Sequence, residues 1–286
     1  MHTMSSPPLT LTKDRLLSLW HSTGKHGVYQ QLPDFLTEDF GVRAPVDERW
    51  RGDRTRLDYL RTRLNFEGLR VVDIGANTGY FSLTLARDLG AQVTAIEPDP
   101  ANRDFLREVA RQYGLSNMAV SDEAVTQATV GHLPATDLVL LLNVLHHAGA
   151  DFDGALVADR SDMPGYLTRY LRALSATTKG MVFQLGYNWH GNKATPLVPV
   201  REPLAMLAYL QPIFEASGWE VDHVALRFDV DDARMVELIH EGGHTRLAPS
   251  SQALADIPAV RDLLAGKPLD KISEFYARPL IICTKV

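Results

Sequence analysis

The chain has 286 residues, 45% of them hydrophobic and 22% charged, and this ordinary globular composition excludes a disordered chain. Its 29 basic and 35 acidic residues give a net charge of −6, which provides no general electrostatic attraction to nucleic acid or to an anionic membrane. A single cysteine, Cys283, excludes an internal disulfide framework and a cysteine-built zinc site, and it fits a reducing compartment.

The hydropathy pattern predicts no membrane span. No stretch reaches about 18 consecutive apolar residues, the length that a membrane helix needs. The first ten residues lack a basic start followed by an apolar run, so they are not typical of a secretory signal. We therefore expect a soluble, cytoplasmic protein.

Residues 1–67 predict a helical segment that precedes the main domain. A capping residue followed by leucines and a tryptophan predicts a short amphipathic helix over 12–20. Glycines and prolines then interrupt the chain repeatedly between 24 and 45, and a second helix is expected over 53–64.

From residue 69 onward, short apolar runs alternate with helical patterns. Strands are expected over 69–74, 92–96, 117–121, 136–143, 180–185, 219–227 and 276–284. Helices are expected over 80–89, 101–113, 164–176 and 203–217. This alternation predicts an α/β fold with a doubly wound, mostly parallel sheet of seven strands, covered by helices on both faces. Ligands of such sheets bind outside the carboxyl ends of the strands.

A long stretch separates the last two predicted strands. Residues 229–274 are too many for a tight connection, and helices are expected around 231–241 and 250–264. We interpret this stretch as an insertion that forms either a cap over the site or an oligomer contact, as in a homodimer. The predicted organisation is thus an N-terminal segment followed by one domain over 68–286.

The most informative motif is a glycine-rich turn that follows the first predicted strand of this domain. Residues 71–82 predict a strand, a glycine turn and the start of a helix. Glycine permits close backbone approach, and a helix N-terminus offers free amide donors and a partial positive charge. About 20 residues later the next strand ends in Glu97-Pro98, where a carboxylate can accept hydrogen bonds from both hydroxyls of a ribose.

The spacing of the glycines discriminates between two nucleotide ligands. A dinucleotide site would carry G-x-G-x-x-G, whereas this turn has Asp73 before Gly75 and continues through Asn77 to Gly79. A carboxylate beside the turn would repel a pyrophosphate, but it could attract an amino-acid ammonium group through water. The pattern therefore favours S-adenosylmethionine or S-adenosylhomocysteine over a dinucleotide.

On these residues the chain resembles the class I S-adenosylmethionine-dependent methyltransferases. Asp73, Gly75 and Gly79 match the first motif of that family, and Glu97 matches its acidic ribose ligand. Asp122 is at the position where the family usually places a contact to the adenine amino group.

The resemblance covers residues 68–228 and the final strand. Residues 143–147 follow the fourth strand, where the family lines its methyl-transfer site, and Asn77 replaces a glycine or cysteine that is common in the first motif. The resemblance implies a Rossmann-like methyltransferase fold, S-adenosyl-L-methionine as cofactor and S-adenosyl-L-homocysteine as product. It implies cofactor contacts at Asp73, Gly75, Asn77, Gly79, Tyr80, Glu97, Pro98, Asp122 and Asn143.

Two adjacent histidines are candidates for chemistry. His146 and His147 end the strongest predicted strand, and a histidine there could deprotonate a hydroxyl or hold the acceptor. The alternative is that both only line the pocket, because methyl transfer mainly requires alignment of donor and acceptor. Asp151 and Asp153 lie nearby, but the spacing is too loose to predict a metal site.

Two further groups of residues could bind the acceptor. The long loop after the fifth strand carries aromatic and polar candidates: Tyr187, Asn188, Trp189, His190 and Lys193. Arg51 belongs to a basic cluster that could bind a phosphate, a carboxylate or tRNA. The alternatives are a solvated loop whose aromatics pack on the body, and a solvated helix face.

Three functions stay open at this point. The first is methyl transfer to an oxygen or nitrogen of a small-molecule or glycan acceptor. The second is tRNA modification, because residues 47–51, 72–75 and 144–147 are loosely similar to the tRNA wobble-uridine carboxymethyltransferases, although the acidic balance makes nucleic acid a weaker expectation. The third is a non-catalytic scaffold that binds the nucleoside. C5 methylation of pyrimidines is disfavoured, because it normally needs a cysteine nucleophile and Cys283 lies in a predicted strand.

Overall fold

The computed structural model describes residues 9–23, 30–41, 52–227, 235–238 and 278–286. Its strands are β1 (Arg70–Ile74), β2 (Gln92–Ile96), β3 (Met118–Ser121), β4 (Thr136–Leu142), β5 (Thr178–Gln184), β6 (Trp219–Leu226), β7 (Val236–Glu237) and β8 (Leu280–Lys285). Its α-helices are α1 (Leu9–Ser22), α2 (Asp34–Phe40), α4 (Asp53–Arg63), α5 (Tyr80–Asp88), α6 (Pro100–Gln112), α7 (Met163–Ser175) and α8 (Pro203–Ser217). Short 3-10 helices cover Val130–His132, Leu145–His147, Arg160–Asp162 and Trp189–Gly191.

The strands form one sheet in the order β3-β2-β1-β4-β5-β8-β6-β7. Neighbouring strands from β3 to β5 are parallel, whereas β8 is antiparallel to both β5 and β6. The chain runs outward in one direction through β2 and β3, and in the other through β4 and β5, so the topology reverses between β1 and β4. Ligands of such sheets bind at this reversal.

Side chains of the central strands alternate between two hydrophobic layers. Val139 and Leu141 of β4 pack in a core that includes residues of α7 and α8. Leu138 and Leu140 face the opposite side, where they pack with residues of α4 and α5. This period-two burial on both faces confirms the predicted doubly wound sheet.

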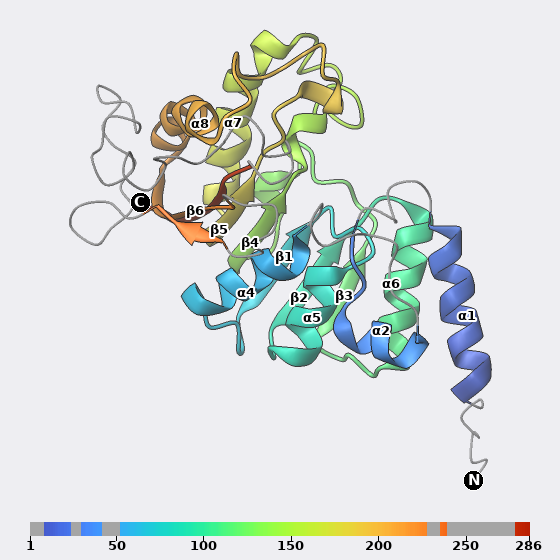
Figure 1. Ribbon diagram of the computed structural model, residues 1–286. Coiled ribbons are helices and arrows are strands. Elements are labelled where there is room, and N and C mark those ends of the chain that lie inside the picture. Colours follow the sequence, from blue (N-terminus) through green and yellow to red (C-terminus); the bar gives the residue numbers. More distant parts are fainter. Residues whose placement is uncertain (1–8, 24–29, 42–51, 228–234, 239–277) are drawn as a thin grey trace.

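The N-terminal helices pack on one end of the fold. Leu16 and Trp20 of α1, together with Phe35 of α2, share a core with Phe105 of α6. Figure 1 shows α1, α2 and α6 together, away from α7 and α8. None of the described helices is long and apolar enough to cross a membrane.

The structure corrects the predicted elements in three places. The sheet has eight strands instead of seven, because Val236–Glu237 pairs with β6 as an additional edge strand. The helix predicted over 231–241 is therefore wrong at these two residues, and the helix predicted over 250–264 lies outside the described residues. Helix α2 was not predicted; it begins after Pro33 and ends at Gly41, which adopts a left-handed conformation.

Candidate functional site

A cavity of about 740 Å³ opens at the carboxyl ends of β1, β2, β4 and β5, at the reversal of the strand order. Ten of the residues selected from the sequence line it: Asp73, Gly75, Asn77, Glu97, Pro98, Asn143, His146, His147, His190 and Lys193. The cavity has two halves. One half lies at the ends of β1 and β2, and the other half lies at the ends of β4 and β5.

The glycine turn forces the backbone close to its neighbours. Gly75 and Gly79 have φ angles of 73° and 86°. A Cβ atom on Gly75 would lie 2.8 Å from Cγ2 of Val144, and one on Gly79 would lie 2.1 Å from Cδ2 of Leu106. Gly75 therefore allows the turn to approach the residues after β4, and Gly79 allows the start of α5 to approach α6.

A glutamine from the N-terminal segment caps the helix that follows the turn. Oε1 of Gln30 accepts a hydrogen bond of 3.0 Å from the backbone N–H of Tyr80, and it also lies 3.4 Å from Oγ1 of Thr78. Gln30 itself lines the cavity. The segment before residue 68 thus contributes directly to the site.

Glu97 is held by backbone amides with its carboxylate at the cavity. Its side chain is buried, with 6% exposure, and it accepts hydrogen bonds from the N–H of Asn77 at 2.7 Å and of Asp99 at 2.9 Å. Burial raises the pKa of this carboxyl group, and the two amides oppose that shift. The carboxylate is therefore fixed in orientation, and each of its oxygens can accept a further hydrogen bond.

Asp73 is the second buried carboxyl group of this half. Its Oδ2 accepts a hydrogen bond of 2.5 Å from Oγ of Ser82. Burial raises the pKa of Asp73 to about 6, and the charge of Glu97 adds to the shift, whereas Ser82 and Arg56 oppose it. A cation bound beside Asp73 would stabilise its ionised form.

A network of polar side chains closes the site at the ends of β4 and β5. Oε1 of Gln184 accepts hydrogen bonds of 2.8 Å from both Arg56 and Asn143. Nη1 of Arg278 donates to Oδ1 of Asn143 at 3.0 Å, and the backbone oxygen of Arg278 accepts from Gln184 at 3.0 Å. The network joins α4, β4 and β5 to Arg278, which lies two residues before the start of β8.

Asp53 connects this network to the N-terminal segment. It is buried and accepts a hydrogen bond of 2.9 Å from the backbone N–H of Gln31, and it forms an ion pair with Arg56. The guanidinium of Arg56 also lies 5.3 Å from the ring centre of Phe81. Asp53, Gln184 and Arg278 were not predicted as site residues, and Arg56 was expected only as a neighbour of the basic cluster. One signal was present, since Asp53 and Arg56 have helical i,i+3 spacing at the start of a predicted helix.

The two adjacent histidines occupy different environments. His146 has 4% exposure, and burial together with the charges of His147, Arg278 and His190 holds its pKa well below the ordinary value. Within the described part of the chain its Nδ1 finds no hydrogen-bond partner. His147 is partly exposed, and its Nδ1 lies 3.0 Å from Oδ2 of Asp151. The ring centres of the two histidines are 4.2 Å apart.

The loop after β5 divides its predicted residues between core and cavity. Tyr187 is fully buried in the core and Asn188 has 1% exposure, and neither lines the cavity. Nε1 of Trp189 donates to the backbone oxygen of Ala148 at 2.8 Å, so its ring packs on the loop after β4. His190 also lies against that oxygen, at 3.0 Å, and it lines the cavity with Lys193.

Three further described residues that were predicted as cofactor contacts lie outside the cavity lining. Gly79 and Tyr80 pack beneath the turn, where Tyr80 is buried in a core cluster. Asp122 is exposed and lies 3.9 Å from both Arg103 and Arg107. Arg51 lies outside the described residues. Within the described ranges, no three His, Cys, Asp or Glu side chains are grouped so that they could hold a metal ion.

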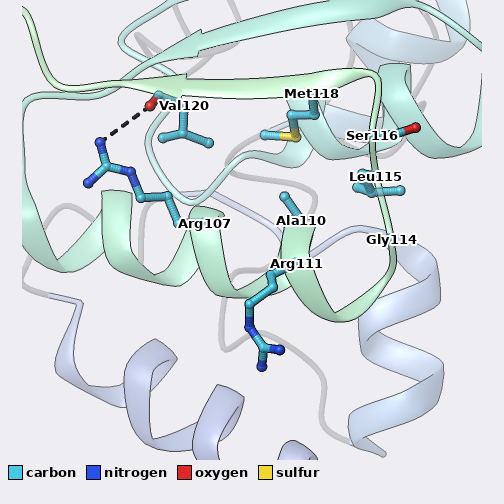
Figure 2. A pocket seen from close by; sticks show the side chains of 8 residues that line it. All are labelled: Arg107, Ala110, Arg111, Gly114, Leu115, Ser116, Met118 and Val120. Atoms are coloured by element: carbon cyan, nitrogen blue, oxygen red, sulfur yellow. Dashed lines mark hydrogen bonds between the residues drawn. The ribbon is translucent and has the colours of Figure 1, made fainter. Parts of the chain in front are cut away.

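A second hollow, of about 490 Å³, lies between α6 and β3 (Figure 2). Arg107 donates to the backbone oxygen of Val120 there, and Arg111 points away from the strand toward its ion-pair partner Glu108. None of the motif residues lines this hollow. The cavity at the strand ends is therefore the candidate site.

Comparisons with known proteins agree on one kind of domain. Residues 72–161 match a family of methyltransferase domains. A ubiquinone biosynthesis O-methyltransferase of Xanthomonas oryzae pv. oryzae is 38% identical over 95 residues, which are 32% of this chain and 38% of that protein. A tRNA U34 carboxymethyltransferase of Desulfotalea psychrophila is 25% identical over 142 residues, 44% of this chain and 42% of that protein.

The chain thus spans less than half the length of both relatives. Among solved structures, WbdD in complex with a kinase inhibitor has a TM-score of 0.52 at 19% identity, over 78% of this chain and 46% of that one. This likeness shows the shared fold. The matched segment, residues 72–161, contains the glycine turn and the acidic end of β2, and it is a methyltransferase domain similar to those of the class I S-adenosylmethionine-dependent enzymes.

Proposed function

We propose that the chain transfers a methyl group from S-adenosylmethionine to an oxygen or nitrogen of a small-molecule or glycan acceptor. The observation that carries this proposal is the division of one cavity into two chemically different halves. Glu97 and Asp73 line the half at β1 and β2, and His146 and His147 line the half at β4 and β5. A volume of about 740 Å³ falls in the range of small-molecule sites.

The residues at β1 and β2 fit the donor. We assign the ribose hydroxyls to the carboxylate of Glu97, because its orientation is fixed and its oxygens can accept further bonds. We assign the ammonium group to Asp73, through water, as the negative charge on the other side of the turn. When bound, the donor supplies a methyl carbon that is already activated, so the main task of the protein is alignment.

The pKa of Asp73 leads to a pH dependence of donor binding. We expect affinity for S-adenosylhomocysteine to rise as the pH increases through about 6, because the ammonium favours ionised Asp73 and binding must release a proton below that pH. In Asp73→Asn the rise should be smaller and the affinity at pH 7 lower. Titration calorimetry from about pH 5 to pH 7, in two buffers of different ionisation enthalpy, measures both the affinity and the released protons.

The matched control for this experiment is Asp88→Asn, which removes a half-exposed carboxylate near the end of α5, outside the cavity. In the unliganded chain, ionisation of Asp73 acts on folding stability, and a rise in pH has an unfavourable effect there. The folded-state pKa of Asp73 lies above its ordinary value of 3.8, so ionisation of Asp73 lowers stability as the pH rises from about 4 to about 6. If the affinity for S-adenosylhomocysteine depended on pH equally in wild type and in Asp73→Asn, the assignment of the ammonium group to Asp73 would be contradicted.

For a hydroxyl acceptor, we assign the general base to His147. If Nδ1–H of His147 donates to Asp151, Nε2 becomes the atom that takes the proton from the hydroxyl. His146 has a pKa well below the ordinary value, so it is neutral but a weak base. We therefore assign His146 to shaping the site. A Cβ on Gly186 would lie 2.8 Å from its Nε2, so the two residues pack tightly.

His147→Ala should lower kcat for a hydroxyl acceptor by about 10²–10⁴-fold, the usual contribution of a general base. Asp151→Asn should lower it less, because the base is kept and only its orientation is lost. Affinity for S-adenosylhomocysteine should stay within about twofold in both variants. Initial rates with radiolabelled donor, over a panel of phenols, glycans and amines, provide the measurement.

His132→Ala is the control, since this exposed histidine lies in a separate 3-10 helix. Near-normal turnover of His147→Ala on its best hydroxyl acceptor would show that no base is required at this position. Turnover by the wild-type chain would distinguish an enzyme from a scaffold that only binds the nucleoside. Unchanged binding of S-adenosylhomocysteine by the variants would show that their loss of turnover is a loss of catalysis.

A tRNA acceptor is the second candidate, supported by the similarity to the tRNA U34 carboxymethyltransferase. The net charge of −6 weighs against it, because nucleic-acid binding draws on many phosphate contacts. Retention of tRNA at physiological ionic strength, lost progressively with added salt, would favour this candidate. Absence of retention would favour the small acceptor.

A further inference from the structure

We infer that the acceptor carries a carboxylate, which binds beside Arg278 and Lys193 at the β5 end of the cavity. This inference rests on the proposed function, and it names the substrate class of the same site.

The charges that line the cavity are segregated by strand. The half at β1 and β2 holds the buried carboxyl groups of Asp73 and Glu97. The half at β4 and β5 holds Arg278, Lys193 and three histidines: His146, His147 and His190. Two described lining carboxylates neighbour that half, and each has a basic partner: Asp151 pairs with His147, and Asp53 pairs with Arg56.

Arg278 is fixed in place by its neighbours. Its side chain is 5% exposed, its guanidinium donates to Asn143, and its backbone oxygen accepts from Gln184. A guanidinium presents a planar set of N–H donors that matches the two oxygens of a carboxylate. Because Arg278 lines the cavity, a carboxylate bound at this end would lie beside its guanidinium.

Lys193 is the second cationic side chain that lines the cavity after β5. It belongs to the exposed loop after β5, and its flexible stem carries a point charge. Arg278, His147 and His190 are all close enough to the buried ring of His146 to help lower its pKa. An anionic group of the acceptor would be attracted by the permanent charges of Arg278 and Lys193.

The donor also has a carboxylate, in its amino-acid part, and this group could bind beside Arg278 in place of an acceptor carboxylate. We assign the donor carboxylate to Arg56, which donates to Gln184 at the end of β5 and is close enough for its charge to act on Asp73. Arg278 lies beyond Asn143 and Gln184 from that point, next to His146. The test therefore includes an arm that separates the two carboxylates.

The experiment uses the full chain saturated with S-adenosylhomocysteine. Calorimetry compares 3,4-dihydroxybenzoate with its neutral methyl ester, which share one ring and differ in charge. We expect the acid to bind at least about tenfold more tightly than the ester, as a charged hydrogen-bonded pair allows. Arg278→Gln should reduce this preference to less than about twofold, and Lys193→Gln should reduce it in part.

Lys179→Gln is the matched control for Lys193→Gln, since this exposed lysine lies at the opposite end of β5. Lys193→Gln keeps the test valid if Arg278→Gln fails to fold. Equal affinity for acid and ester, absence of binding by both, or a preference that neither variant changes would overturn the inference.

A donor arm compares S-adenosylhomocysteine with 5′-methylthioadenosine, which lacks the amino-acid part. Arg278→Gln should change the affinity for both nucleosides by the same factor, because its hydrogen bond to Asn143 does not involve the amino-acid part of the donor. A selective loss of affinity for S-adenosylhomocysteine would assign Arg278 to the donor and overturn the inference. Absence of S-adenosylhomocysteine binding by wild type would instead overturn the proposed function.

Discussion

Replacing Gly79 by alanine should lower the free energy of unfolding by about 2–5 kcal/mol and abolish donor binding. A positive φ costs a residue with a side chain about 1–2 kcal/mol, and overpacking adds about 1–3 kcal/mol. The φ of Gly79 is 86°, and a Cβ there would lie 2.1 Å from Cδ2 of Leu106. Either the buried side chain of Leu106 or the turn must shift to relieve this contact, and a shift of the turn would carry Gly75 and the first turn of α5 with it.

Gly114→Ala separates the cost of a positive φ from the cost of overpacking. Gly114 has a φ of 62°, and a Cβ atom there would meet nothing within 4 Å. The free energy of unfolding of this variant should fall only by the cost of the positive φ, about 1–2 kcal/mol. Urea denaturation of both variants provides the measurement. An equal loss in the two would show that the close approach of the turn to Leu106 adds nothing to stability.

Glu97→Ala should weaken S-adenosylhomocysteine binding by about 100-fold or more. Hydrogen bonds to a charged group are worth about 1.5–3 kcal/mol each, and two ribose hydroxyls would lose their acceptor. The amides of Asn77 and Asp99 would lose theirs as well, so the turn would also be held less firmly. Calorimetric titration with S-adenosylhomocysteine measures the loss.

Two variants separate binding from folding in this experiment. Glu123→Ala removes an exposed carboxylate that follows the neighbouring strand and should bind normally. Glu97→Gln keeps the size of the side chain and removes the charge, so it should bind more weakly than wild type and better than Glu97→Ala. An affinity of Glu97→Ala close to that of wild type, with unchanged thermal unfolding, would contradict the assignment of the ribose.

The centre of the fold could be predicted because its signals are local. Apolar runs of strand length, the glycine turn and the acidic strand end identify β1, α5 and β2 within 30 residues of sequence. Helix α2 was missed because the glycines and prolines around it suggested only loops, although Pro33 and Gly41 mark its two ends. The two-residue β7 is too short to leave a period-two pattern.

The polar network could not be predicted, because tertiary structure brings its members together. Arg56, Gln184 and Arg278 come from α4, β5 and the residues before β8, and nothing in their local sequence relates them. In the loop after β5, the direction of each side chain decides its role. Tyr187 points into the core and His190 reaches the cavity, and composition alone does not distinguish these outcomes.

The central claim is that the cavity at the ends of β1, β2, β4 and β5 binds the methyl donor. Calorimetric titration of the wild-type chain with S-adenosylhomocysteine tests it most directly. The claim predicts one site with micromolar or tighter affinity and a rise in melting temperature with ligand concentration. No heat of binding and no thermal shift at millimolar ligand would contradict it.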